Sequence, residues 1–252
     1  MRIPLYLSLA AGLIASPLVV AEELPAAVRQ IEAKGAKVVG SFDAPNGMKG
    51  YAAQFRNQGV AIYLTADGKH ALVGSLFDEQ GQDLSEPQLE KLVYAPMAKE
   101  VWAKMEKAAW IADGKADAPR IVYLFSDPNC PYCNLFWEQA RPWVESGKVQ
   151  LRHIMVGIIR ADSPGKSAAL LAAKDPQKAL LEHEKAGKAS TLKALDKVPA
   201  EVQAKLDANQ ALMDELGLSA TPAIFYLDDQ QRLQQQQGAP RPELLGKILG
   251  KR

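Results

Sequence analysis

The stretch Arg120-Ile-Val-Tyr-Leu-Phe-Ser-Asp-Pro-Asn-Cys-Pro-Tyr-Cys-Asn-Leu-Phe-Trp-Glu-Gln-Ala140 decides the fold of this 252-residue chain. Its first seven residues are almost all apolar and predict a buried strand over 120–126. The residues after the second cysteine predict the start of a helix, because apolar side chains recur there on one face: Cys133, Phe136, Trp137 and Ala140. We therefore expect Cys133 to point into the core. Cys130, one position before the helix, is expected to be exposed.

The two cysteines of this stretch are the only ones in the chain, and their position predicts redox chemistry. A cysteine between a strand and a helix N-terminus faces unpaired backbone N–H groups and the positive end of the helix dipole. Both favour the thiolate over the thiol. The thiolate is the form that attacks disulfides, so Cys130 is the candidate nucleophile.

Three other uses of a cysteine pair fit the sequence poorly. Zinc needs about four ligands, and the three histidines, His70, His153 and His183, lie far from the pair and from one another. A c-type haem needs a histidine where Asn134 stands. A structural disulfide across a two-residue loop would restrain the unfolded chain very little. The sequence therefore predicts a redox pair with no metal and no cofactor, and a packed role for His153 in an apolar strand.

The N-terminus predicts export. Residues 1–21 have a short positive start at Arg2, an apolar run from Leu5 to Val20 and a small-residue cleavage site at Ala21, as in a cleaved Sec signal peptide. The alternative is a retained membrane anchor, but the run is short and interrupted for a spanning helix. Export places the pair where disulfides persist, such as a bacterial periplasm. Lys and Arg number 30 against 29 Asp and Glu, so no basic field predicts binding to nucleic acid.

The remaining chain divides into two predicted domains and a connecting helix. The first domain spans 22–82 and is expected to hold one short helix and four strands, at 36–42, 48–55, 59–65 and 70–77, separated by turn signals. A unit of this size buries only a modest core, so we expect it to pair with a second copy of itself. Residues 83–116 are predicted to form a linker helix, helical from Ser85 to Asp113.

The second predicted domain spans 117–252. A strand over 149–156 is expected to follow the motif helix, and then a largely helical insert. Residues 223–227 and 232–237 predict a hairpin, closed by a helix over 242–249. The run of glutamines at 234–237 is interpreted as an exposed edge strand, since polar edges suppress unwanted sheet pairing.

The motif, the insert and the run Ala220-Thr-Pro-Ala223 ahead of a hairpin together resemble a thioredoxin-fold domain. Thr221-Pro222 matches the cis-proline loop of that fold. The whole arrangement resembles the periplasmic disulfide isomerase family of DsbC and DsbG, and the segments 125–133 and 136–151 are more similar to its DsbG members. The resemblance implies an α+β chain with a cystatin-like N-terminal dimerisation domain, a linker helix and a C-terminal thioredoxin-fold catalytic domain.

The resemblance also implies roles for individual residues. Cys130 attacks and Cys133 resolves the mixed disulfide, while Pro131 and Tyr132 tune the pair without reacting. Thr221 and Pro222 bind the substrate backbone, and the Thr221 hydroxyl is expected to hydrogen-bond the Cys130 sulfur. Asn134 stands where a lysine is expected, which removes a positive charge near Cys130. A membrane reductase of the DsbD type is the implied electron donor.

Two classes of function follow as hypotheses. The first is a thiol–disulfide oxidoreductase that works reduced, isomerising wrong disulfides or reducing sulfenylated cysteines in misfolded or oxidised exported proteins. The second is a dimeric holdase chaperone that binds partly folded chains without chemistry. Within the first class, the alternative is a dithiol oxidase that introduces disulfides.

Overall fold

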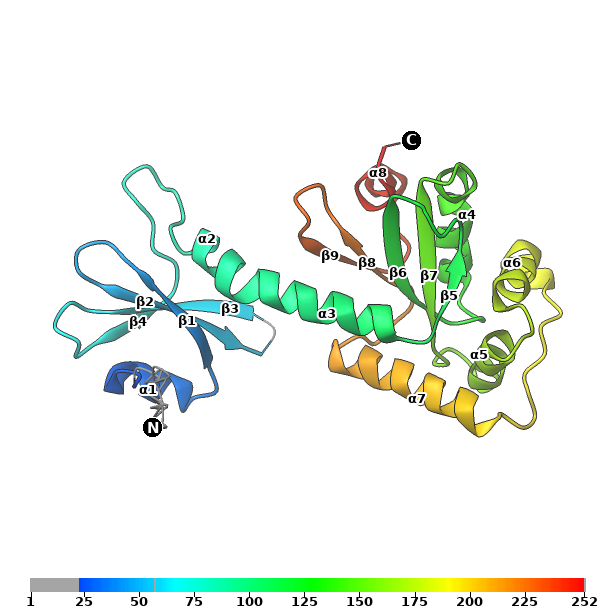
Figure 1. Ribbon diagram of the computed structural model, residues 1–252, viewed down its shortest axis with the longest axis horizontal. Helices are drawn as coiled ribbons and strands as arrows, with labels where there is room; N and C mark the ends of the chain where they lie inside the picture. Colours follow the sequence, from blue (N-terminus) through cyan, green and yellow to red (C-terminus); the bar gives the residue numbers. More distant parts are fainter. Residues whose placement is uncertain (1–22, 57, 252) are drawn as a thin grey trace, which may run out of the picture. The chain divides into compact units, whose positions relative to one another are not determined.

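The computed structural model describes residues 23–56 and 58–251, which fall into two compact units divided after Leu89 (Figure 1). The predicted signal peptide, residues 1–21, lies outside the described residues. Over the described ranges, no helix has both the length and the apolar character that crossing a bilayer requires.

The first unit is a four-stranded antiparallel sheet with one helix packed on it. The strands lie in chain order, β1 (Lys37–Asp43), β2 (Lys49–Phe55), β3 (Gln58–Leu64) and β4 (Ala71–Val73). Helix α1 (Ala26–Glu32) covers one face, where its fully buried Val28 packs in one cluster with Ile62 and Leu64 of β3. The four predicted strands are all present, and the last is shorter than predicted.

The segment between the predicted domains is helical over a shorter range than expected. It comprises α2 (Glu86–Leu89), a π-helical turn η1 (Glu90–Tyr94) and α3 (Ala95–Lys107). The prediction of helix as far as Asp113 is wrong, because the backbone of Ala108 is extended and Trp110–Asp113 forms strand β5. This strand alternates between half-buried and buried side chains and pairs with a strand of the second unit, a period of two rather than 3.6.

The second unit contains a five-stranded mixed sheet in the order β5-β7-β6-β8-β9. Strand β6 (Arg120–Ser126) runs parallel to β7 (Val149–Met155) and antiparallel to β8 (Ala223–Leu227). The predicted hairpin is present, and β9 (Leu233–Gln237) is the edge strand that the glutamines indicated. The helices are α4 (Pro131–Glu145), α5 (Ser163–Leu171), α6 (Pro176–Ala186), the turn η2 (Gly187–Ala189), α7 (Ala200–Glu215), the turn η3 (Pro242–Leu244) and α8 (Leu245–Leu249).

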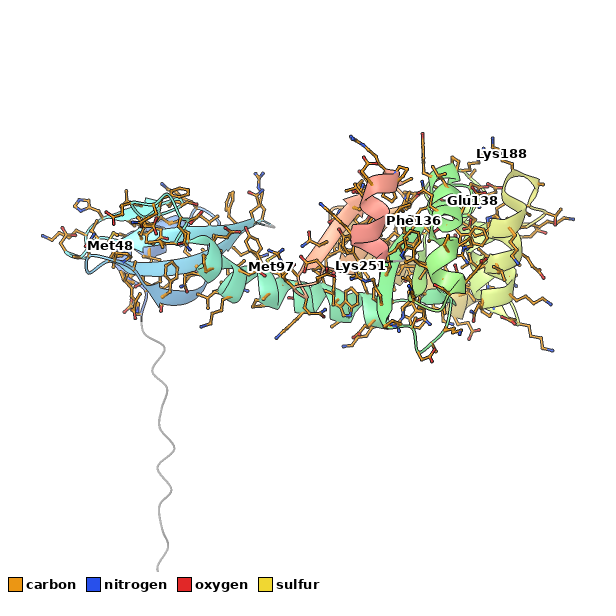
Figure 2. All side chains as sticks on the ribbon, turned by 90° about the horizontal axis from the view of Figure 1, so that it is seen from above. Met48, Met97, Phe136, Glu138, Lys188 and Lys251 are labelled. Atoms are coloured by element: carbon orange, nitrogen blue, oxygen red, sulfur yellow. The ribbon has the colours of Figure 1, made fainter. Side chains whose placement is uncertain are left out.

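Strand β6 is buried on both faces, and this places the motif that follows it. Val122 and Leu124 pack with α4 and α8, whereas Tyr123 and Phe125 pack with α3 and α7 on the opposite face (Figure 1). Figure 2 shows Phe136 on α4, where it belongs to the first of these clusters. Because β6 is packed on both faces, its carboxyl end has one defined position, and Cys130 just after it is positioned as well.

A largely buried cluster of charged and polar side chains links β5, β7 and α4. The Arg141 guanidinium makes a bidentate ion pair with Asp113, and His153 Nε2 lies 3.8 Å from the same carboxylate. Burial alone would raise the pKa of Asp113, but His153 and Arg141 outweigh it and lower that pKa to about 2. His153 is 1 % exposed, so its predicted packed role is confirmed.

Candidate active site

Cys130 is the N-cap residue of α4, which begins at Pro131. Its backbone is extended, with φ −85° and ψ 111°, and its sulfur accepts a hydrogen bond of 3.4 Å from the amide of Cys133. Pro131 suits the first helical position because it has no N–H that would need a partner there. The sulfur therefore stands in the place where a helix N-terminus favours negative charge.

The prediction that Cys130 is exposed is wrong. Its side chain is 5 % exposed, and that of Cys133 is 1 % exposed. The Cys130 sulfur lies 3.3 Å from the carbonyl oxygen of Thr221, which accepts from the thiol, so a loop distant in sequence shields it. Pro131 is exposed and Tyr132 is 61 % exposed, so these two residues of the motif face solvent.

The Thr221–Pro222 peptide bond is cis, as the resemblance implied. The expected hydrogen bond from the Thr221 hydroxyl to the Cys130 sulfur is absent. That buried hydroxyl has no hydrogen-bond partner among the described residues, and the Thr221 carbonyl contacts the sulfur instead. The loop thus presents backbone rather than side chain to the nucleophile.

The two thiols have opposite acidities. The Cys133 side chain hydrogen-bonds the Cys130 sulfur and makes the largest contribution to lowering the pKa of Cys130 to about 6. Burial opposes this shift, while the amides of Cys133 and Tyr132 add to it. Burial, and then the neighbouring Cys130, raise the pKa of Cys133 well above that of a free thiol. Near neutral pH the site therefore holds one thiolate and one thiol.

A buried carboxylate, which the sequence left unassigned, holds the loop before the motif. Asp127 is 1 % exposed and accepts four hydrogen bonds. One oxygen takes the amide of Asn129 at 2.8 Å and the hydroxyl of Ser163 at 2.9 Å. The other takes the amides of Ile158 and Ile159 at 2.7 and 2.9 Å. Asp127 therefore ties the nucleophile loop to the loop after β7, and Asp-Pro after a buried strand was its signal in the sequence.

Two residues of the helical insert contact the motif, one just before Cys130 and one just after Cys133. His183 Nε2 lies 2.8 Å from the carbonyl oxygen of Pro128, ahead of Cys130. Asn134, after Cys133, donates to both the main-chain oxygen and the carboxylate of Glu184 at 2.7 Å. Asn134 thus serves as an anchor for α6 in place of the expected positive charge. Sequence reasoning missed both contacts, because their partners are about fifty residues apart in the chain.

Part of the surface around the motif is apolar. Tyr132, Leu135, Ile158 and Ile159 are all partly or largely exposed, between 37 % and 61 %. Ile158 and Ile159 reach this surface because their amides bind Asp127 below the motif. Within residues 23–56 and 58–251, no group of three His, Cys, Asp or Glu side chains is placed to hold a metal ion.

Comparison with protein families gives two matches that together span most of the chain. Residues 105–252 match a thioredoxin-like domain, and residues 19–86 match the disulfide bond isomerase protein N-terminal domain. The thiol:disulfide interchange protein DsbG of Pseudomonas aeruginosa is 67 % identical over 92 % of this chain and 91 % of its own. DsbG of Escherichia coli is 48 % identical over 91 % of this chain and 93 % of its own.

A solved structure supports the predicted fold class. A periplasmic thioredoxin-like protein from Salmonella enterica serovar Typhimurium superposes with a TM-score of 0.50 at 18 % identity, covering 60 % of this chain and 94 % of that one. With the family matches, this confirms the predicted α+β class and the thioredoxin-like second domain.

The acidity of Cys130 gives the first testable prediction. The rate of Cys130 alkylation by iodoacetamide is expected to rise with pH around a midpoint of about 6, as the thiolate forms. Replacing Cys133→Ala is expected to move that midpoint upward, because the Cys133 side chain contributes most to the low pKa.

The matched control is Cys130→Ala, in which the remaining buried Cys133 should stay unreactive over the same pH range. A midpoint for Cys130 near that of a free thiol, about 8.5, would contradict the proposed thiolate stabilisation.

Proposed function

Since the chain belongs to the DsbC and DsbG family of thiol:disulfide interchange proteins, we propose that it works in its reduced form as a disulfide isomerase and reductase of exported proteins. The observation that carries this proposal is the low pKa of Cys130 beside a protonated Cys133. A stabilised thiolate favours the dithiol over the disulfide form. The pair is therefore easily returned to the dithiol form, which isomerisation requires.

In the isomerase reaction the Cys130 thiolate attacks one sulfur of a substrate disulfide. A bond forms between Cys130 and the substrate, the substrate disulfide breaks, and its second sulfur leaves as a thiolate. A different thiolate of the same substrate can then attack the mixed disulfide, form a new disulfide and expel Cys130. The protein ends reduced, so no net electrons are transferred.

In the reductase reaction the same thiolate attacks the sulfur of a sulfenylated cysteine. A mixed disulfide forms, and the hydroxide leaves as water with one proton. Cys133 then loses its proton, attacks the Cys130 sulfur and releases the substrate thiolate. The substrate gains two electrons, and the protein ends as the Cys130–Cys133 disulfide.

The interaction between the two sulfurs determines when Cys133 can attack the mixed disulfide. While Cys130 is a thiolate, its charge and its hydrogen bond help to raise the pKa of Cys133. A mixed disulfide at Cys130 removes both effects, so Cys133 becomes more acidic only after the substrate is bound. Cys133 therefore stays an unreactive thiol in the free dithiol. It becomes reactive in the mixed disulfide, where its attack releases the substrate.

Chaperone activity is proposed on the apolar surface around the motif. Tyr132, Leu135, Ile158 and Ile159 offer exposed apolar area beside Cys130, of the kind that binds partly folded chains through apolar contact. Misfolded proteins expose such residues, so the same surface would serve as a holdase and deliver substrate to the thiolate.

The first unit is proposed to form a homodimer through β4. This strand pairs only with β3 in the described part of the chain, and its Leu72 and Val73 are 59 % and 56 % exposed. An edge strand with unpaired backbone groups and exposed apolar side chains is suited to pair with a second copy.

The export signal predicted for residues 1–21 supports a periplasmic location, where a dithiol needs a source of electrons. We assign that role to a membrane reductase of the DsbD type. The alternative is a dithiol oxidase, which also uses a stabilised nucleophilic thiolate but is kept oxidised between turnovers.

Substitution of the nucleophile separates the two activities. Cys130→Ser is expected to reduce the rate on a scrambled-disulfide or sulfenylated substrate to that of buffer alone, because a serine hydroxyl does not ionise near neutral pH. Suppression of substrate aggregation, followed by light scattering, should remain. Full redox activity in this variant would show that Cys130 is not the nucleophile.

The matched variant is Cys133→Ser, which keeps the attacking sulfur and removes the resolving one. It should accumulate a covalent complex with substrate, visible on a non-reducing gel and absent with Cys130→Ser.

The dimer prediction is tested on the two edges of the first sheet. Leu72→Glu with Val73→Glu should give a monomer in sedimentation experiments, because two buried charges would oppose pairing at β4. Val39→Glu on β1, at the opposite edge, is the control and should leave the dimer intact. If the β4 variant sediments as the unmodified chain does, the assigned interface is wrong.

A further inference from the structure

A cavity of about 590 Å³ opens beside the nucleophile. Cys130 and Pro131 form one side of it, and Asn134 of α4 extends that side. The opposite side comes from the insert, from His183 and Glu184 of α6 and from Lys188 of η2. A polypeptide joined to the Cys130 sulfur therefore has this cavity directly next to the point of attachment.

The walls of the cavity are fixed by the contacts that tie the insert to the motif. The bond between His183 and the Pro128 carbonyl holds α6 against the nucleophile loop. The double contact from Asn134 to Glu184 holds the same helix against the first turn of α4. Glu184 is 4 % exposed, so its carboxylate is part of the wall and is bonded to Asn134 rather than open to solvent.

The charges that a ligand would meet are positive. Arg160, Lys166 and Lys188 line the cavity. Lys166 is engaged, because its ammonium lies 3.0 Å from Asp162 and 2.8 Å from the side-chain oxygen of Asn129. Arg160 and Lys188 are exposed, and no ion pair joins either of them to another residue of the described chain. Figure 2 shows Lys188 at the outer end of α6.

We propose that this cavity is a substrate subsite for an acidic segment, an Asp or Glu within a few residues of the cysteine that is being reduced. Arg160 and Lys188 bind the carboxylate of the substrate segment. The Thr221 carbonyl lies at the Cys130 sulfur, where the cysteine of that segment is attached. The subsite rests on the proposed function, and it adds a preference among substrates that the two cysteines cannot provide. Because both cations are exposed, the attraction is screened by salt.

The test compares peptides that differ only in charge. Three peptides carry one cysteine blocked as a mixed disulfide with a small neutral thiol, and the flanking residues are Glu, Gln or Lys. The single-turnover rate at which the full chain in its dithiol form reduces each peptide is measured. Each rate is divided by the rate on hydroxyethyl disulfide, a small disulfide that does not reach the subsite, to give a normalised rate. The Glu peptide is expected to react about fivefold faster than the Lys peptide at low salt, a modest effect typical of exposed charges. The ratio should shrink as salt is added.

Variants locate the effect. Arg160→Gln with Lys188→Gln should bring the Glu and Lys peptides to equal normalised rates, and Arg160→Glu with Lys188→Glu should reverse their order. Lys185→Glu is the matched control, since Lys185 is an exposed lysine of α6 outside the cavity. It should leave the ratio as in the unmodified chain.

Equal normalised rates for the three peptides with the unmodified chain would overturn the subsite. So would a change of ratio in Lys185→Glu as large as that in the cavity variants, because the effect would then be one of overall charge. If hydroxyethyl disulfide itself is not reduced, the proposed function fails rather than the subsite.

Discussion

The interaction between the Cys133 side chain and the Cys130 sulfur is the one on which the chemistry of this protein depends. It makes the largest contribution to the low pKa of Cys130, and it adds to burial, the larger cause, in raising the pKa of Cys133. This contact and the burial of Cys133 together give two identical side chains different acidities. The helix N-terminus supports it through the amides of Cys133 and Tyr132, so no cation is needed where Asn134 stands.

The rest of the second unit keeps that contact in place. Strand β6, packed on both faces, ends at the motif, and the buried carboxylate of Asp127 ties the loop before Cys130 to the loop after β7. The insert adds His183 and Glu184 from the other side. Catalytic groups held by such a supporting layer keep their geometry without reorganisation during reaction.

Local patterns in the sequence predicted much of this arrangement. The strand before the motif, the helix after it and the buried position of Cys133 all follow from periodicity within about twenty residues. What the sequence did not predict is non-local. Cys130 is buried because Thr221 lies against it from 91 residues away, and Asn134 finds its partner 50 residues away in Glu184. The helix expected to reach Asp113 ends at Lys107 because pairing with β7 recruits Trp110–Asp113 into the sheet.

We propose that the pair is kept reduced where the protein works, so that the Cys130 thiolate is free to attack. It is tested most directly by acid quenching of cells that export the protein, followed by alkylation of free thiols and separation of the two redox forms. We expect Cys130 and Cys133 to be mostly reduced, and to become oxidised when the membrane reductase is removed. A pair that is mostly oxidised while the reductase is present would contradict the account and favour a dithiol oxidase.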